Sequence, residues 1–286
     1  MDVANLEGRI VLVTGAASGI GRATAIACAR RGASLVICDV NEEGLAETGS
    51  QLRSLGARVL ARRVDVADES AMRELATLVH ADHPAVDLLV NNAGVGLGGG
   101  FLDTTLEDWE WILGINLRGV LLGCHFFVPA MVRRGQGGHV VNVASMAAFL
   151  PGETLAAYAT TKCGVLGFSE ALADELQWHG IGVTAACPGF IDTPIVASTR
   201  MRGPQARPEA RDQATRFYRW RGYGPERVAE NILRAVARGR VVAPISPEAW
   251  LAFGLRRLSP GLARALSRAM GRRMRRPPQE RDDATS

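Results

Sequence analysis

Lysine is nearly absent from this chain of 286 residues. Of the 33 basic side chains, Lys162 is the only lysine and the other 32 are arginines. The five cysteines form no Cys-x-x-Cys pair, so neither a disulfide scaffold nor a redox motif is indicated. They lie within apolar segments, which is typical of buried, reduced thiols. These cysteines are Cys28, Cys38, Cys124, Cys163 and Cys187.

Metal-binding and targeting signals are also lacking. His80 and His83 flank Asp82 at a spacing that a metal could use, but no further ligand cluster supports them, so we expect no metal. The N-terminus has neither the basic nor the apolar segment of a secretory signal. The longest uncharged apolar run, residues 119–132, is too short to cross a bilayer. We therefore expect a cytoplasmic protein.

Apolar segments alternate with helical patterns along most of the chain. This alternation with short turns predicts parallel pairing, and hence an α/β fold with a doubly wound, Rossmann-like parallel sheet of about seven strands. The expected strands are residues 10–13, 34–38, 58–64, 86–90, 139–143, 182–187 and 240–243.

A glycine-rich turn follows the first expected strand and leads into an alanine-rich helix. Strand, glycine turn and helix N-terminus together form an anion site, because backbone N–H groups and the positive end of the helix face a pyrophosphate. The candidate cofactor-binding residues of this turn are Gly15, Ser18, Gly19, Ile20 and Gly21.

Asp39 ends the next expected strand, 24 residues beyond Gly15. A carboxylate at this position can accept hydrogen bonds from the adenosine ribose hydroxyls, and it repels a 2′-phosphate. Val40 and Asn41 follow it, so no arginine stands directly beside it, and we expect NAD rather than NADP. The alternative interpretation, that Asp39 caps the next helix, is compatible with this role.

Tyr158 and Lys162 are four residues apart in a segment with a helical pattern, so both side chains project from one face. A free tyrosine has a pKa near 10, and a neighbouring ammonium favours the phenolate and lowers that pKa. Ser145 lies 13 residues before Tyr158, at the end of an apolar strand. In a random pair this spacing would indicate only a solvated helix face, but the solitary lysine and Ser145 favour a catalytic site.

Four motifs resemble the short-chain dehydrogenase/reductase family, over roughly residues 6–243. They are Thr14-Gly-Ala-Ala-Ser-Gly-Ile-Gly21, Asn91-Asn-Ala-Gly94, Ser145, and Tyr158-Ala-Thr-Thr-Lys162. The resemblance implies that Asp65 and Val66 contact the adenine and that Asn116 holds a water linked to the lysine, as a fourth catalytic residue. A satisfied core asparagine is the alternative for Asn116. It also implies a variable substrate lid, about residues 190–224, and a homodimer or homotetramer.

Two further turns complete the expected cofactor site. Asn92, Ala93 and Gly94 let the backbone pass close to the cofactor ribose, and Asn92 can tie neighbouring strands together. The turn after the strand 182–187 lies where ligands of open α/β sheets bind, and we expect it to meet the nicotinamide amide. Its candidate residues are Pro188, Gly189, Ile191 and Thr193.

These residues predict a reversible, NAD-linked oxidation of a secondary alcohol to a ketone, with Tyr158 as general acid–base and Tyr158 and Lys162 also contacting the cofactor. Aromatic residues in the expected lid favour an apolar, fairly large substrate. One alternative is an NADPH-dependent reductase of 3-oxoacyl or polyketide-type ketones. Another, from a different class, is a non-catalytic protein that senses the cofactor.

The basic excess belongs to the C-terminal third of the chain. Residues 1–193 carry 13 basic and 21 acidic side chains, whereas residues 194–286 carry 20 and 8. We expect a catalytic domain over residues 1–245, a basic amphipathic helical extension over 246–276 and a disordered tail over 277–286. The extension could dock its apolar row on the body of the protein, or residues 260–276 could contact an anionic membrane surface. We expect no nucleic acid partner, because aromatic residues do not interleave with these arginines.

Overall fold

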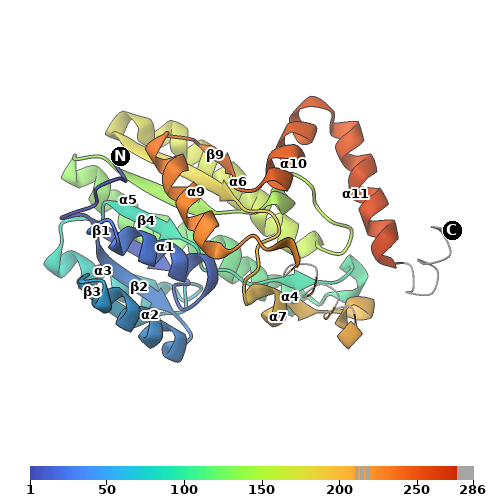
Figure 1. Cartoon of the computed structure of the whole chain (residues 1–286), viewed down its shortest axis with the longest axis horizontal. Helices are drawn as coiled ribbons and strands as arrows, with labels where there is room; N and C mark the ends of the chain where they lie inside the picture. Colours follow the sequence, from blue (N-terminus) through green and yellow to red (C-terminus); the bar gives the residue numbers. More distant parts are fainter. Residues whose placement is uncertain (210–211, 213–215, 217–219, 276–286) are drawn as a thin grey trace.

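A seven-stranded parallel sheet forms the centre of the protein in this computed structural model (Figure 1). The structure describes residues 1–209, 212, 216 and 220–275. The strand order is β3-β2-β1-β4-β6-β7-β9, so the predicted doubly wound α/β sheet is confirmed. The strands are β1 (Ile10–Thr14), β2 (Ser34–Asp39), β3 (Val59–Arg63), β4 (Leu88–Asn91), β6 (Gly138–Val143), β7 (Ile181–Cys187) and β9 (Val242–Pro244).

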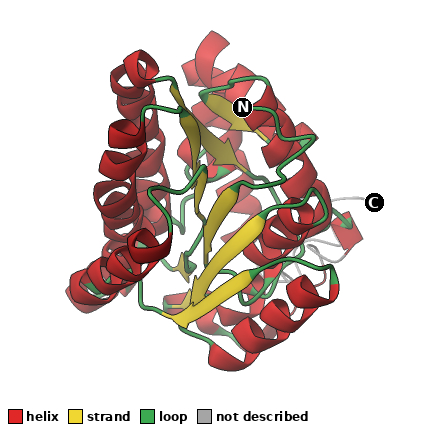
Figure 2. Cartoon of the chain, turned by 90° about the vertical axis from the view of Figure 1, so that its left-hand side faces the viewer, coloured by secondary structure: helices red, strands yellow, loops and turns green. Residues whose placement is uncertain are grey.

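Helices cover both faces of this sheet (Figure 2). One face packs on α1 (Gly19–Ala29), α2 (Glu42–Ser54) and α9 (Pro225–Ala237). The other packs on α3 (Glu69–Asp82), α5 (Gly119–Arg134) and α6 (Ala156–Leu176). Because successive side chains point to opposite faces, Val11 and Val13 enter the first core and Leu12 the second. Burial of both faces explains why the strands are continuously apolar.

The order of the strands reverses between β1 and β4, which lie side by side in the sheet but are far apart in the sequence. Ligands of open α/β sheets bind beyond the carboxyl ends of strands at such a switch point. The glycine-rich turn follows β1, and Asn92 to Gly94 follow β4. The fold therefore brings these two predicted cofactor segments to the same end of the sheet.

The long helical stretch Leu106–Arg134 contains an irregular segment. It consists of α4 (Leu106–Leu113), a π-helical turn (Gly114–Arg118) and α5. The continuous stretch Leu106–Arg134 is long and apolar enough to cross a membrane by length and composition, unlike the shorter uncharged run weighed from the sequence. Half of its most apolar 18-residue segment is buried inside the protein, and the core helix of a globular domain can have the same length and composition.

The predicted C-terminal extension contains two helices, α10 (Pro247–Leu258) and α11 (Pro260–Arg275). Ala249 and Ala252 of α10 are buried, and Ala252 shares an apolar core with β7 and α6. Figure 1 shows α11 extending beside the body of the protein. The division at residue 245 stays a prediction, although α10 packs as part of the body, and the tail 277–286 lies outside the described residues.

Candidate functional site

The glycine-rich turn and the end of β4 are locked together by hydrogen bonds. The backbone N–H groups of Asn92 and Ala93 each donate to Thr14 Oγ1 at 3.0 Å. Asn92 Nδ2 donates to the carbonyls of Thr14 and Gly15 at 2.9 and 3.0 Å. Gly15 has a φ of +65°, and a Cβ added there would lie 2.7 Å from Ala93 Cα. Only glycine therefore allows this close approach of the two segments.

The N-terminus of α1 has backbone donors that no side chain caps. Ser18 is its N-cap residue but forms no side-chain cap hydrogen bond, and the first turn contains no acidic residue. In contrast, Asn41, Asp68 and Thr105 cap α2, α3 and α4 through their side chains. The N–H groups of Gly19, Ile20 and Gly21 are thus suited to the pyrophosphate of a dinucleotide.

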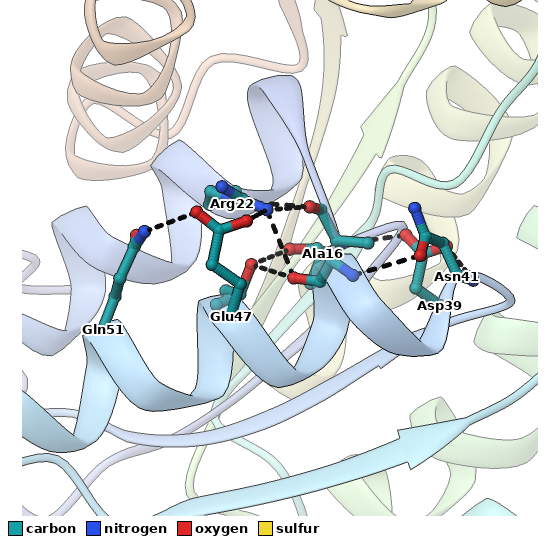
Figure 3. Close-up of polar contacts among 9 residues, drawn as sticks. Ala16, Arg22, Asp39, Asn41, Glu47 and Gln51 are labelled. Atoms are coloured by element: carbon teal, nitrogen blue, oxygen red, sulfur yellow. Dashed lines mark hydrogen bonds and ion pairs between the residues drawn. The ribbon is translucent and has the colours of Figure 1, made fainter.

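Asp39 lies at the end of β2, beside the glycine-rich turn (Figure 3). Its Oδ2 accepts a hydrogen bond from Ala17 N at 2.9 Å, and its Oδ1 accepts one from Asn41 N at 3.0 Å. The alternative that Asp39 caps the next helix is wrong, because the side chain of Asn41 caps α2 by accepting from Gly44 N. The neighbouring Arg22 donates to Glu47 Oε2 at 2.9 Å, so an acidic partner already matches its charge.

Asp65 and Val66 lie in the turn between β3 and α3. Asp65 is exposed, and its Oδ1 accepts from Ala67 N at 2.9 Å. Val66 is buried against Gly119, where an added Cβ would lie 2.7 Å from Val66 Cγ2. This packing fixes the turn against the start of α5, with the Asp65 carboxylate at the surface.

Ser145, Tyr158 and Lys162 come together at the carboxyl end of β6. Tyr158 and Lys162 both lie on α6, and the Lys162 Nζ atom is 5.7 Å from the centroid of the Tyr158 ring. Lys162 Nζ donates to the Val143 carbonyl at 2.9 Å. The Ser145 hydroxyl is hydrogen-bonded to Tyr158 and also accepts from Ala147 N at 3.1 Å. Gly94 adjoins this cluster, since a Cβ added there would be 3.5 Å from Lys162 Nζ.

The pKa values of this cluster differ from the sequence-based prediction. Burial raises the pKa of Tyr158, and the hydrogen bond with Ser145 only partly opposes this. Burial also lowers the pKa of Lys162 to about 8, and the nearby Cys187 opposes that change. The predicted lowering of the Tyr158 pKa by Lys162 is not found, because the ammonium bonds the Val143 carbonyl and desolvation governs both groups.

Asn116 lies in the π-helical turn and is fully buried. Its Oδ1 accepts from Val95 N at 2.7 Å, and its Nδ2 donates to the Val95 carbonyl at 2.9 Å. Nδ2 also donates to Thr161 Oγ1 at 3.3 Å, and the Thr161 hydroxyl donates to the Tyr158 carbonyl at 2.7 Å. The side chain is thus satisfied, as in the core interpretation, and it anchors the loop after β4 to the helix that carries Tyr158.

The turn after β7 connects three parts of the site. The Pro188 carbonyl accepts from Met146 N at 2.8 Å, next to Ser145. Ile191 is buried in the core. At the other end, Thr193 lies against the N-terminus of α1, since a Cβ on Gly19 would be 3.3 Å from the Thr193 side chain. Gly189 contacts α10, because an added Cβ would overlap the Glu248 carboxylate.

An ion pair that the sequence did not suggest joins the segment expected to form a lid, about residues 190–224, to α4. The lid strand β8 (Arg200–Met201) pairs with β5 (Leu97–Gly98). Next to it, Arg202 donates from Nε and Nη2 to the two carboxylate oxygens of Asp108, at 2.7 Å each. This hydrogen bonding lowers the pKa of Asp108 to about 2, against the opposing effect of burial. The lid also includes the short helix α7 (Ile195–Ser198).

Apolar residues near the site and aromatic residues of the expected lid have different positions. Val95, Leu97, Trp109 and Trp111 share an apolar cluster with Tyr158. Phe149 is buried and packs instead against Phe253 of α10, with ring centroids 5.2 Å apart. Four aromatic residues of the expected lid are not part of the Tyr158 cluster or lie outside the described residues. Trp220 is 81% exposed. The Tyr223 hydroxyl donates a hydrogen bond to the Ile245 carbonyl. Phe217 and Tyr218 lie outside the described residues.

Four of the five cysteines are buried. Burial raises the pKa values of Cys28, Cys38, Cys124 and Cys187 to about 12, which leaves these four thiols protonated and unreactive. The prediction that all five are buried is wrong for Cys163, which is exposed on α6. In the described part of the chain, no group of three or more His, Cys, Asp or Glu side chains could hold a metal ion.

Comparison with known proteins identifies the family. The family model for short chain dehydrogenases matches residues 9–203. The probable oxidoreductase EphD of Mycobacterium tuberculosis (strain ATCC 25618 / H37Rv) is 42% identical over 263 residues, 91% of this chain and 44% of that protein. This chain therefore spans less than half the length of the EphD relatives that it matches.

Two other relatives are matched over most of their own length. The 3-oxoacyl-(acyl-carrier-protein) reductase FabG of Thermotoga maritima is 36% identical over 192 residues, 66% of this chain and 77% of that protein. A short chain dehydrogenase/reductase from Burkholderia phymatum, solved in complex with NAD, is 33% identical with a TM-score of 0.83 and covers 92% of this chain and 97% of its own. From the sheet, the residues at its switch point and these matches, we conclude that the protein belongs to the short-chain dehydrogenase/reductase family.

Proposed function

We propose that this protein uses NAD to interconvert a secondary alcohol and a ketone. The observation that carries the proposal is the cluster of Ser145, Tyr158 and Lys162 at the same end of the sheet as the uncapped N-terminus of α1. A dinucleotide whose pyrophosphate binds at α1 would extend along this edge of the sheet. Bound NAD would supply the acceptor for the hydride.

The side chains of the protein then transfer one proton to or from the substrate oxygen. Tyr158 removes it from the substrate hydroxyl, and Ser145, already hydrogen-bonded to Tyr158, orients the same oxygen. Because burial raises the pKa of Tyr158, the phenol is protonated at neutral pH and is suited to donate a proton to a ketone. Alcohol oxidation needs the phenolate and should therefore become faster as the pH rises.

The choice of NAD over NADP rests on Asp39. Ala17 N and Asn41 N hold its carboxylate at the end of β2, and the nearby Arg22 is paired with Glu47. A 2′-phosphate would meet this negative charge without a free arginine to offset it. Quenching of tryptophan fluorescence by NADH and NADPH tests this choice directly. Tighter binding of NADPH would favour the NADPH-dependent reductase of 3-oxoacyl or polyketide-type ketones, a rival supported by the similarity to FabG.

A matched pair of variants makes the titration specific. Asp39→Asn keeps the size of the side chain and one carbonyl acceptor but removes the negative charge, so NADPH affinity should rise and NADH affinity should fall. Glu42→Gln removes a carboxylate from the exposed first turn of α2 and should change neither affinity. If Asp39→Asn leaves the NADH-to-NADPH preference of the wild type unaltered, Asp39 does not decide the cofactor.

We also propose an apolar substrate, because Tyr158 belongs to an apolar cluster that includes Val95, Leu97, Trp109 and Trp111. Turnover on a panel of secondary alcohols of increasing chain length, measured as NADH absorbance, tests this proposal. A preference for short polar alcohols would contradict it. Bound NADH without turnover on the whole panel would instead support the non-catalytic, cofactor-sensing alternative.

The C-terminal helix supports a proposal of peripheral contact with an anionic membrane by a cytoplasmic protein. In α11 the side chains of Leu262 and Leu266 are 56% and 36% exposed, so this part of the apolar row is open to solvent. Ala263 is buried, and Ser267 contacts the body of the protein by donating to the Pro151 carbonyl at 2.6 Å. Exposed leucines with flanking arginines suit a negatively charged lipid surface.

Sedimentation with vesicles of phosphatidylserine or phosphatidylcholine tests the membrane proposal. The wild type should sediment with the former only, and the double variant Leu262→Asp, Leu266→Asp should remain in solution. Equal, negligible sedimentation of both proteins would exclude membrane contact.

For the assembly we propose a homodimer or homotetramer formed through α5 and α6. Leu121 of α5 and Cys163 of α6 are exposed on these helices in the single chain. Light scattering after gel filtration should give the mass of two or four chains, and a monomer at micromolar concentration would contradict the proposal.

A further inference from the structure

The first turn of α10 reaches the loop that follows β7. Glu248 Oε1 accepts a hydrogen bond from Phe190 N at 3.0 Å, across 58 residues of sequence. Its other oxygen, Oε2, accepts from Arg221 Nη2 at 2.6 Å, at the C-terminal end of the lid. One carboxylate thus holds both the loop expected to meet the nicotinamide and the segment expected to cover the substrate.

The surroundings of Glu248 favour a fixed, charged carboxylate. Its side chain is 19% exposed and that of Arg221 is 30% exposed. Gly189 leaves no room between the loop backbone and the carboxylate, since an added Cβ would overlap Glu248 Oε1. Burial alone would raise the pKa of Glu248, but hydrogen bonds, including those from its own backbone N–H, Phe190 N and Arg221, lower it.

A second set of hydrogen bonds follows the same route. Tyr223 OH donates to the Ile245 carbonyl at 2.7 Å, and Asp192 N donates to the Tyr223 carbonyl at 3.2 Å. The end of the lid is therefore bonded both to the segment before α10 and to the loop after β7. At the start of that loop, the Pro188 carbonyl accepts from Met146 N, the residue after Ser145.

We propose that Glu248 is a positioning residue that couples the lid, through Arg221, to the nicotinamide-facing loop, through Phe190 N. This inference rests on the proposed function, because it assumes that the loop meets bound NAD. The loop after β7 and the C-terminal end of the expected lid segment then both depend on this carboxylate for their positions. A change at Glu248 disturbs cofactor binding and substrate binding together.

Another ion pair in the chain, between Arg31 and Glu230, serves as a matched control for the pair of Arg221 and Glu248. Arg31 and Glu230 join α1 to α9 at 2.8 Å, with side-chain exposures of 23% and 43%. Arg31 also donates to the Ala27 carbonyl of α1, and among the described residues neither side chain bonds the loop after β7 or the expected lid. Glu230→Gln therefore measures what the loss of a partly buried pair does to stability alone.

The experiment compares Glu248→Gln, Arg221→Gln, their double variant and Glu230→Gln in the full chain. Glutamine keeps a carbonyl acceptor for Phe190 N but loses the charge that binds Arg221. We expect Glu248→Gln to weaken NADH binding and raise the substrate KM by roughly tenfold, the equivalent of about 1.4 kcal/mol. Glu230→Gln should change neither quantity, although both variants lower Tm to a similar extent.

The double variant tests the coupling itself. If Arg221 and Glu248 act as one unit, the double variant should lose no more NADH affinity than Glu248→Gln alone. Limited trypsin digestion gives a readout independent of activity: NADH should slow cleavage of the wild-type lid but not that of Glu248→Gln.

The outcomes separate this inference from the proposed function. A wild type that binds NADH, with Glu248→Gln and Glu230→Gln indistinguishable in KM and NADH affinity, would overturn the positioning role only. A wild type that does not bind NADH would overturn the proposed function and this inference with it.

Discussion

Replacing Lys162 by methionine should make the protein more stable and less active. The amine is 4% exposed, and burial lowers its pKa from 10.5 to about 8. Each pKa unit corresponds to about 1.36 kcal/mol, so at pH 7 the protonated amine destabilises the folded state by about 3 kcal/mol relative to an uncharged side chain. Replacing the amine by methionine would remove this destabilisation, but loss of the hydrogen bond to the Val143 carbonyl would offset about 1 kcal/mol of the stability gained.

The expected net gain is about 2 kcal/mol at pH 7, or a rise in Tm of about 4 °C for a chain of this size. Its dependence on pH has a definite sign. The folded pKa lies below the unfolded one, so between pH 8 and 10.5 the unfolded wild type binds more protons, and its stability rises with pH. The stability difference between Lys162→Met and the wild type should therefore shrink across this window.

Urea unfolding at pH 7 and pH 10, with NADH-linked turnover in parallel, measures both effects. Turnover should fall by roughly 10² or more if the ammonium supports proton transfer at Tyr158. Lys162→Arg is the companion variant: its guanidinium stays charged across the window, so it should lower stability without this pH dependence. A Lys162→Met protein that is less stable than the wild type at pH 7, or an unchanged difference at pH 10, would refute the reasoning.

Three further outcomes are expected from single substitutions. Tyr158→Phe should lower turnover by about 10²- to 10⁴-fold while leaving the free energy of unfolding within about 1 kcal/mol, because the phenol loses its hydrogen bond with the Ser145 hydroxyl. Gly21→Ala should abolish NADH binding in fluorescence titrations and cost on the order of 1–3 kcal/mol of stability, since the added Cβ overlaps the Gly15 carbonyl. Asp108→Asn should lower Tm at pH 7 by breaking the pair with Arg202. Because the folded pKa of Asp108 is depressed to about 2, this difference should shrink as the pH falls from about 4 towards 2.

Local sequence patterns were sufficient to predict the sheet and most of the residues that lie together at the carboxyl ends of its strands. The strand that ends at Thr14, the glycines that follow it and Asp39 at the end of β2 are each specified within a few residues of sequence. The same holds for Tyr158 and Lys162, whose spacing of four places them on one face of α6.

Features that depend on distant contacts could not be predicted in this way. Glu248 meets Phe190 only because α10 folds back on β7, and a glutamate in the first turn of a helix is otherwise an ordinary complement to the helix dipole. Asp108 shows the same problem: its place in a capping box with Thr105 is visible in the sequence, but its pair with Arg202 lies 94 residues away. The predicted direction of the Tyr158 pKa shift was also wrong, because desolvation depends on all the residues that bury the side chain.

Several features that cost stability lie at the same end of the sheet. The buried Lys162 ammonium, the uncapped start of α1 and the π-helical turn at Asn116 are each unfavourable when considered alone. Elsewhere α2, α3 and α4 are capped, and the cores on both faces of the sheet are continuous. When several unfavourable features lie close together, they indicate a site where residues are positioned to bind a ligand rather than to stabilise the fold. A dinucleotide that pairs with the α1 donors would recover part of this free energy, so NADH should stabilise the wild type by more than it stabilises Gly21→Ala.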